Sequence, residues 1–257
     1  MNLLRIWVLA TNVFREVIRD RILYVIGFYA ILMALALQLL PQISVGADSK
    51  IFLDLGLAVT SLLGAIVAIF VGTGLVNKEI EKRTVLVLIP KPISRTEFLV
   101  GKHLGLLAVL TVMITTMTAI YFMLLLWGKI AAPWFSLLMT QLFLLLELGV
   151  MTAVAIVFGV FTSSILATLF SFGIYFMGHL SKDLLKLGEI TKNPNIEQLT
   201  RSLYLVLPDL EKFNLKNEAV YGILPSTSDL LMVFLYGILY IIFLLTLANL
   251  IFARRQF

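Results

Sequence analysis

The sequence predicts an all-α membrane protein with six transmembrane helices, an amphipathic N-terminal helix and a charged cytoplasmic elbow between two spans. Hydrophobic residues make up 60% of its 257 residues and charged residues only 14%, whereas soluble domains have about 45–50% and about 25%. Uncharged stretches of about 20 residues, the length a helix needs to cross the hydrocarbon layer, recur along the chain. One globular core cannot hold this apolar excess. We therefore expect a single transmembrane domain over residues 1–257.

The chain has no cysteine, which excludes disulfides, thiolate metal sites and cysteine nucleophiles. Its formal net charge is +5, which in a soluble protein would suggest a nucleic-acid partner. In a membrane protein, Lys and Arg retained on the cytoplasmic side explain the same excess. We therefore expect the lipid bilayer, and no nucleic acid, among the partners.

Residues 1–21 carry too many charges to span the membrane, and their pattern predicts an amphipathic helix. Apolar residues, among them Trp7 and Phe14, recur at steps of four and three on one face, while Arg5 and Glu16 lie on another. A basic amphipathic helix with aromatic residues suits the membrane interface. A helix packed on the protein's own cytoplasmic face is the alternative.

Six stretches are long and apolar enough to cross the membrane. The predicted spans are residues 22–40, 55–76, 104–128, 133–159, 163–181 and 230–253. Pro41 is expected to end the first span. The fourth and fifth follow each other with little polar sequence between them, which predicts a hairpin. Its turn is expected near Gly159–Ser164, where hydroxyl residues can cap a new helix.

Small residues recur every four positions along the second span. They are Gly56, Thr60, Gly64, Ala68 and Gly72. Such a seam lets another helix approach closely within the membrane. The partner helix is expected either in the same chain or in a second copy.

The distribution of positive charge predicts the orientation. Six spans place both termini on one side. The side with the termini and residues 77–103 holds twelve Lys and Arg residues against eight on the other side. The positive-inside rule therefore predicts cytoplasmic termini, with residues 181–227 outside. That outer segment has amphipathic pieces, and it either caps the mouth of a path or is a solvated connector.

Residues 77–103, called the elbow from here on, form the densest charge cluster of the chain. Residues 77–89 can extend the second span into the cytoplasm as a helix. Within that helix, Glu79 and Arg83 form a favourable pair four residues apart. This predicts a helix that carries the membrane span beyond the lipid.

A sharp turn is expected to follow this helix. Pro90 and Pro92 stop it, since each lacks an N–H group and biases its predecessor away from the α region. Residues 94–97, Ser-Arg-Thr-Glu, form a capping box, and Ile93 and Phe98 are placed as a hydrophobic staple. The pattern predicts a rigid cytoplasmic knuckle, with an ordinary charged loop as the alternative.

The elbow sequence resembles a known family. Residues 78–84 (KEIEKRT), followed by residues 92–95 (PISR) and Gly101-Lys102, are similar to the loop between the second and third membrane helices of ABC-2-type transporter permeases. The six-span order, the N-terminal helix and the long outer loop are similar too. Within that family, the permeases that accompany nitrous-oxide-reductase maturation are the subgroup this chain resembles.

The resemblance implies a permease subunit of an ATP-binding cassette exporter in the cell membrane. In that family the elbow is a coupling helix that docks on a separate ATP-hydrolysing subunit. Two such subunits, which bind ATP and Mg, and a second permease chain forming a homodimer are the implied partners. The implied ATPase-coupling residues are Glu79, Glu81, Arg83, Thr84, Pro92, Ser94 and Arg95.

The sequence has no G-x-x-x-x-G-K-[ST] phosphate loop. Gly101-Lys102 comes closest, but Thr96 and His103 stand where that motif needs a glycine and a hydroxyl residue. If ATP drives this protein, another chain must bind it. We therefore expect no catalytic site and no bound cofactor here, and the two separated histidines predict no metal site.

Glu147 lies near the middle of the fourth span, where a carboxyl group is costly and is expected to face the bundle interior or water. It is either a functional group or a hydrogen-bonded structural one. Thr111, Thr115 and Thr118 form a polar stripe on the third span that serves interhelical hydrogen bonds or a substrate path. A membrane-embedded enzyme using Glu147 is an alternative function, as is a channel or scaffold that ATP does not drive.

Overall fold

The computed structural model describes residues 2–18, 22–43, 47–81, 94–191 and 194–254. Within these ranges the fold is helical and contains no strand, as predicted. The elements are α1 (Leu3–Val17), α2 (Leu23–Ile43), α3 (Asp48–Glu81), α5 (Arg95–Trp127), α6 (Trp134–Phe161), α7 (Ser164–His179), α8 (Ser181–Thr191), α9 (Pro194–Val206), the 3-10 helix η2 (Leu210–Phe213), α10 (Lys216–Tyr221) and α11 (Thr227–Arg254).

Five of the described helices, α2, α3, α5, α6 and α11, are long and apolar enough to cross a membrane. A sixth crossing arises only if α7 and the first part of α8 count as one span, bent by 66°. The predicted fold class is therefore confirmed. The stretch predicted as the fifth span, residues 163–181, forms the single helix α7 of 16 residues, which counts as a candidate span only together with the first part of α8.

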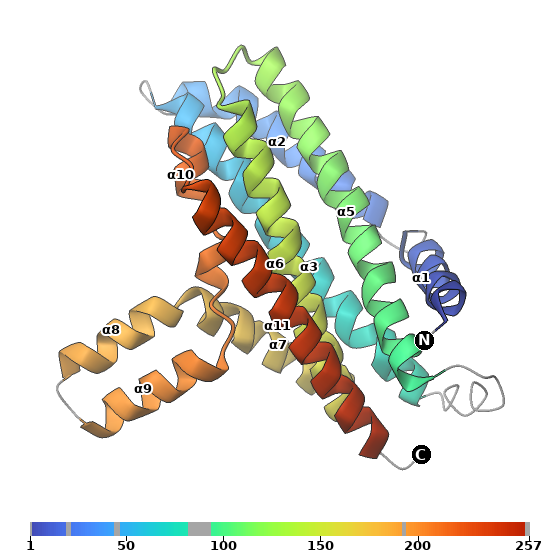
Figure 1. Cartoon of the computed structure of the whole chain (residues 1–257). Coiled ribbons are helices and arrows are strands. Elements are labelled where there is room, and N and C mark those ends of the chain that lie inside the picture. Colours follow the sequence, from blue (N-terminus) through green and yellow to red (C-terminus); the bar gives the residue numbers. More distant parts are fainter. Residues whose placement is uncertain (1, 19–21, 44–46, 82–93, 192–193, 255–257) are drawn as a thin grey trace.

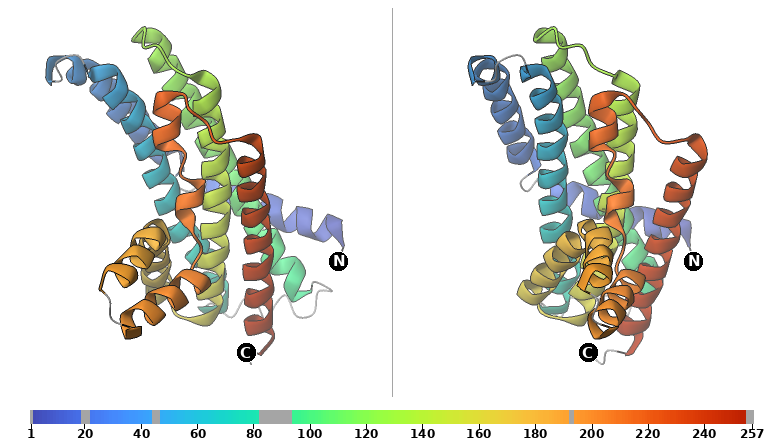
Figure 2. Two further views of the ribbon diagram at one scale, coloured as in Figure 1. Left: turned by 60° about the vertical axis from the view of Figure 1, so that its left-hand side comes forward. Right: turned by 90° about the vertical axis from the view of Figure 1, so that its left-hand side faces the viewer.

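The long helices run side by side, and α6 lies among them (Figures 1 and 2). It packs against α3, α5, α7, α10 and α11. The predicted turn of the α6–α7 hairpin is confirmed at Thr162–Ser163, but the predicted capping is not, because Ser163 at the start of α7 makes no side-chain capping hydrogen bond. Pro41 does not end α2, because the helix continues to Ile43. So close to a helix end, a proline disturbs only the last turn.

The small residues of α3 face helices of the same chain, which decides between the two alternatives left open by the sequence. A Cβ atom added to Gly64 would lie 2.7 Å from the side chain of Leu148 on α6. One added to Gly72 would lie 2.8 Å from the Cβ atom of Ala155, also on α6. These positions bring two membrane helices into close contact.

The segment between α7 and α11 differs from the expected outer loop. Helices α8 and α9 form a hairpin that leaves the bundle sideways, in the half that also holds the C-terminus (Figure 2). The chain then runs along the bundle towards the opposite end. Leu210, Phe213, Leu215 and Ala219 are buried there, and η2 and α10 pack against α6. The second half of this segment is therefore part of the bundle core.

Candidate coupling site at the start of α5

The structure describes the two ends of the elbow, residues 77–81 and 94–103. Helix α3 ends at Glu81, whose side chain is not described, and α5 begins at Arg95. The predicted residues Arg83, Thr84 and Pro92, with Pro90 and Ile93, lie outside the described residues. The helical extension of the second span is confirmed as far as Glu81.

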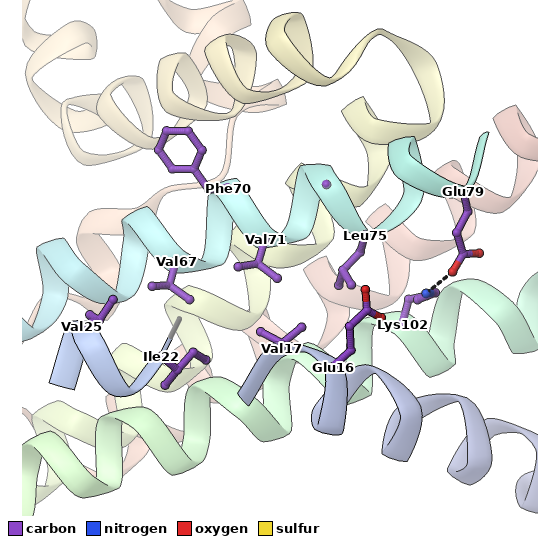
Figure 3. Close-up of a pocket in the computed structure, with 11 residues that line it drawn as sticks. Glu16, Val17, Ile22, Val25, Val67, Phe70, Val71, Leu75, Glu79 and Lys102 are labelled. Atoms are coloured by element: carbon purple, nitrogen blue, oxygen red, sulfur yellow. Dashed lines mark hydrogen bonds and ion pairs between the residues drawn. The ribbon is translucent and has the colours of Figure 1, made fainter. Parts of the chain in front are cut away.

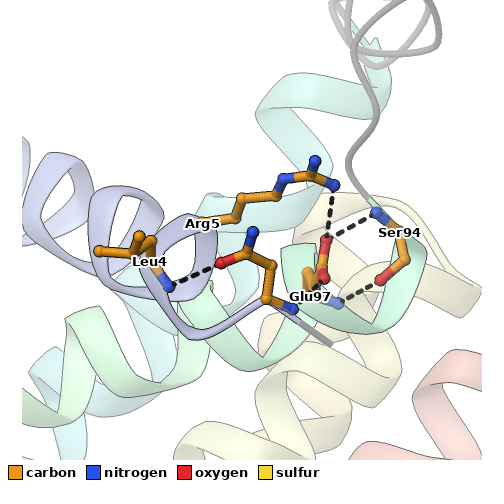
Figure 4. Close-up of polar contacts among 5 residues, drawn as sticks. Leu4, Arg5, Ser94 and Glu97 are labelled. Carbon is orange, nitrogen blue, oxygen red and sulfur yellow. Dashed lines mark hydrogen bonds and ion pairs between the residues drawn. The ribbon is translucent and has the colours of Figure 1, made fainter.

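The predicted capping box at the start of α5 is confirmed (Figure 4). The Glu97 backbone N–H donates to Ser94 Oγ at 3.2 Å, and the Ser94 backbone N–H donates to Glu97 Oε2 at 3.0 Å. The two residues thus satisfy each other's free N–H groups at the helix start. Phe98, the described half of the predicted staple, stacks on Phe252 of α11 with ring centroids 6.0 Å apart.

The carboxylate of Glu97 also holds the beginning of α1. The Asn2 backbone N–H donates to Glu97 Oε1 at 2.6 Å, and Arg5 Nη1 lies 4.0 Å from Glu97 Oε2. The Asn2 side chain in turn caps α1 by accepting from the Leu4 N–H at 3.1 Å (Figure 4). A single buried carboxylate therefore joins the first turns of two helices.

Helix α1 packs directly on α5. Cβ atoms added to Gly101 and Gly105 would lie 2.7 Å from the Leu9 Cβ atom and from the Ala10 carbonyl oxygen. The side chains that α1 buries are Ile6, Val13 and Val17. Leu3, Leu4 and Trp7 are instead 80%, 75% and 73% exposed. Helix α1 therefore has two apolar faces, one packed against α5 and one exposed; the first supports the alternative of a helix packed on the protein itself, and the place of α1 at the membrane interface stays a prediction.

A second ion pair joins α3 to α5. The ammonium group of Lys102 contacts the carboxylate of Glu79, and it also lies 5.5 Å from the ring centroid of Phe98. Figure 3 shows this pair at the polar end of a hollow between α1, α2 and α3, with Glu16 beside it and valines such as Val67 lining the other end. The predicted partner of Glu79, Arg83, lies outside the described residues.

Arg95 ties the start of α5 to the end of α11. Its Nη1 atom donates to the Ala253 carbonyl oxygen at 2.7 Å, and its guanidinium carbon lies 6.0 Å from the centroid of the Phe252 ring. A cation at the C-terminal end of a helix satisfies free carbonyl groups and favours the helix dipole.

Asn77, at the inner edge of the elbow, joins α3 to α6. With its amide oriented to donate, the nitrogen gives hydrogen bonds to the carbonyl oxygens of Gly159 (3.0 Å) and Thr162 (2.9 Å). The side chain is buried, so it satisfies the otherwise free carbonyl groups at the end of α6. Like Asn2, this residue has a role in the site that sequence reasoning did not assign, whereas Glu97 was predicted only as part of the capping box and not as a tie to α1. The only signal was a polar residue at the edge of an apolar run.

The residues predicted as a possible polar site within the membrane do not lie together. Thr118 is buried, whereas Thr111 and Thr115 are exposed, so the three do not form one stripe towards a common partner. Thr111 and Thr118 donate to carbonyl oxygens of their own helix, at 2.8 and 2.7 Å. These two bonds are not the interhelical ones that the sequence suggested. Glu147 does face the bundle interior, 3.4 Å from His179.

Comparison with known proteins assigns the sequence to a family. A family model described as ABC-2 family transporter protein matches residues 7–257, which include every described helix except the first turn of α1. No curated protein matches the chain. With a helical bundle of five to six candidate spans and a family match over nearly its full length, the chain belongs to the ABC-2 family of transporter proteins.

Proposed function

We propose that this chain, the multi-pass membrane subunit of an ABC-2 transporter, is an exporter permease that a separate ATPase drives through the elbow. The observation that carries the proposal is the set of contacts at the described edges of the elbow. Glu97 ties α5 to α1, Lys102 ties it to α3, and Arg95 ties it to α11. A force applied to the elbow would therefore reach several membrane helices at once.

These contacts can transmit movement between helices because they are strong and lie near helix ends. Each joins a helix terminus, or a residue within two turns of one, to a neighbouring helix through a charged group. Charge-assisted hydrogen bonds are roughly twice as strong as neutral ones. Asn77 extends the connection to α6, the helix at the centre of the bundle. Displacement of the elbow would thus tilt helices as rigid bodies rather than bend a loop.

The partners follow from the chain's own sequence and from symmetry. Since the chain lacks a phosphate-binding loop, ATP and Mg would bind to the ATPase, and two ATPase copies would serve two permease chains. A symmetric pair is the commonest assembly of identical subunits, so a homodimer is proposed. Both termini lie in the same half of the bundle (Figure 1), which supports a shared cytoplasmic side.

Residue roles at the elbow are part of the proposal. Glu79, Glu81, Arg83, Thr84, Pro92, Ser94 and Arg95 are proposed as the coupling residues. Two of them have a described contact to another helix, Glu79 with Lys102 and Arg95 with Ala253. Their role thus includes holding the elbow on the bundle. The nitrous-oxide-reductase-maturation type of permease is the proposed subgroup.

Copurification from native membranes tests the proposal. An ATPase with a phosphate-binding loop should be recovered with the chain, and its ATPase activity should respond to the permease. Charge reversal in Arg95→Glu should uncouple ATP hydrolysis from transport. The control Arg201→Glu reverses an exposed charge on α9, away from the elbow, and should leave coupling intact.

Two outcomes would count against the proposal: no copurifying ATPase, or unchanged coupling in Arg95→Glu. Because Arg95 also bonds to α11, the thermal stability of the variant must be measured beside its coupling. The same purification separates the proposal from the alternatives raised by the sequence. A membrane-embedded enzyme using Glu147, a channel or a scaffold would each work without an ATPase.

A further inference from the structure

A carboxyl group lies at the centre of the bundle. Glu147 is the middle residue of α6, which spans Trp134–Phe161, so it is about 20 Å from either end of that helix at 1.5 Å per residue. Only 1% of the residue is exposed. A charged group at such a depth is costly, and it is rare without a partner.

The C-terminal end of α7 supplies that partner. Helix α7 has 16 residues and is therefore about 24 Å long, shorter than the hydrocarbon layer of about 30 Å. It starts beside the end of α6 and stops level with the middle of α6. Its last residue, His179, has Nε2 3.4 Å from Glu147 Oε1. The chain then bends by 66° into α8.

The hydrogen bond of Nδ1, the second ring nitrogen of His179, shows which nitrogen can exchange a proton. Nδ1 lies 3.1 Å from the backbone carbonyl oxygen of Tyr175. A carbonyl oxygen only accepts, so Nδ1 carries a hydrogen, and Nε2 is the nitrogen that gains or loses a proton. At 3.4 Å, Nε2 and the carboxyl oxygen are close enough to exchange a proton after a small movement.

Gln141 adds neutral polar groups to a gap that Glu147 also lines. Both atoms of its buried amide, Nε2 and Oε1, make no hydrogen bond with any described residue. Gln141 and Glu147 line one narrow gap together with Asn214 and Lys216, which are partly exposed. A buried group of this kind requires an explanation. A donor and an acceptor side by side suit a water molecule or a hydrated proton better than a metal ion.

Other titratable groups lie around Glu147 and His179. Tyr175 from α7, Asp209 and Glu211 from the η2 segment and Lys216 from α10 act on it electrostatically. Asp209 has its own partners, with Ser181 Oγ donating at 2.9 Å and Lys212 Nζ at 3.6 Å. Of the titratable groups in the described residues, His179 is the one within ion-pair distance of Glu147, at 3.4 Å.

We propose that Glu147, His179 and Gln141 form an intramembrane proton-binding site. One proton is held between the Glu147 carboxyl and His179 Nε2, and Gln141 orients the water through which it exchanges. When the proton moves from carboxyl oxygen to Nε2, a neutral pair becomes a carboxylate and an imidazolium. Both forms have zero net charge, which a low-dielectric interior favours.

In a transporter, this site would give the helix end at His179 a role in the transport cycle. Separation of α7 from α6 during a transport cycle would expose the pair to water and let its proton exchange. The site would also make the coupled ATPase activity depend on pH, and this consequence rests on the proposed function. The existence of the proton site does not depend on that function.

Infrared difference spectroscopy of the full-length chain, with the subunits that copurify with it, tests the site directly. The pH is stepped between about 5 and 8, where histidine changes its charge. A carboxyl C=O signal that changes with pH is expected in the wild type and should be lost in Glu147→Gln. Asp54→Asn, which removes an exposed carboxyl from α3, should keep the signal.

The second variant, His179→Gln, keeps the test valid if Glu147→Gln fails to fold. It should move the midpoint of the Glu147 signal by about one pH unit or more, because a neighbouring charge is lost. The absence of any Glu147-dependent signal, or a midpoint unchanged in His179→Gln, would overturn the proton site. Either result would leave the proposed function standing, and a missing ATPase partner would leave the proton site standing.

Discussion

Arg95 Nη1, at the first residue of α5, donates a 2.7 Å hydrogen bond to the carbonyl oxygen of Ala253, near the last residue of α11. The two residues are 158 positions apart in the chain. This bond makes the entry of one membrane helix and the exit of another a single structural unit. The same first turn holds α1 through Glu97, so helices from both ends of the sequence meet at the elbow.

Replacing Arg95 by Ala should loosen the end of α11. The Ala253 carbonyl would lose its donor and the guanidinium would leave the Phe252 ring. Faster hydrogen exchange is expected in the last two turns of α11 and not in α6. Mass spectrometry of the exchanged protein measures this. Arg254→Ala, which removes the adjacent exposed arginine, should show wild-type exchange. Equal exchange in both variants would contradict the tie.

The Glu79–Lys102 pair allows a charge swap. Lys102→Glu should destabilise the protein because Glu79 would face a like charge. The double variant Glu79→Lys, Lys102→Glu should recover about 1 kcal/mol of the loss, as expected for a coupled pair. Unfolding in detergent, measured for all four combinations, gives the interaction energy. Additive effects would show that the pair is not coupled.

The swap also separates two roles of Glu79. If the residue acts only by holding α3 on α5, coupling to the ATPase should return in the double variant. If Glu79 docks directly on the ATPase, stability should return while coupling stays low. The ratio of transport to ATP hydrolysis, read beside the melting temperature, distinguishes these results.

The capping box should contribute measurably to the start of α5. Ser94→Ala is expected to cost about 1 kcal/mol, since one N–H group at the helix start loses its acceptor. Glu97→Gln should lower the melting temperature further, because it weakens the tie to Asn2 and α1 as well. Limited proteolysis of α1 checks the second effect. Glu16→Gln, an exposed acid of α1, should be neutral. An effect of Glu16→Gln as large as that of Glu97→Gln would contradict the proposed tether.

The seam between α3 and α6 predicts opposite results for two glycine substitutions. In Gly72→Ala the new methyl group would lie 2.8 Å from the Ala155 Cβ atom, so a loss of about 1–3 kcal/mol is expected from overpacking. In Gly173→Ala the methyl group meets nothing within 4 Å, and alanine should strengthen α7 by up to about 1 kcal/mol. Thermal unfolding of both variants measures the difference. Equal effects would mean that the seam is not tightly packed.

Features that depend on neighbouring residues alone could be predicted from the sequence. The long apolar runs became membrane-length helices, and residues 94–97 became the capping box, since both depend on interactions within a few turns of chain. The turn between α6 and α7 was placed for the same reason. The predicted coupling residues whose side chains are described, Glu79, Ser94 and Arg95, cluster at one end of α5.

Features that depend on distant residues could not be predicted. The sequence offered Arg83 as a partner for Glu79, because a local rule considers only positions a few residues apart. Likewise, the spacing of the threonines on α5 puts them on one side of the helix, but tertiary packing buries Thr118 and leaves Thr111 exposed.

The sequence by itself determined the class of molecule and the place of its elbow, because lipid solubility and helix capping are set by composition and short spacing. Only the tertiary structure decided which helices the small residues join, that the chain bends sharply after α7, and that His179 meets Glu147. The reason is physical: a buried charge or a close helix contact gains its energy from a partner that the chain brings near only when it folds.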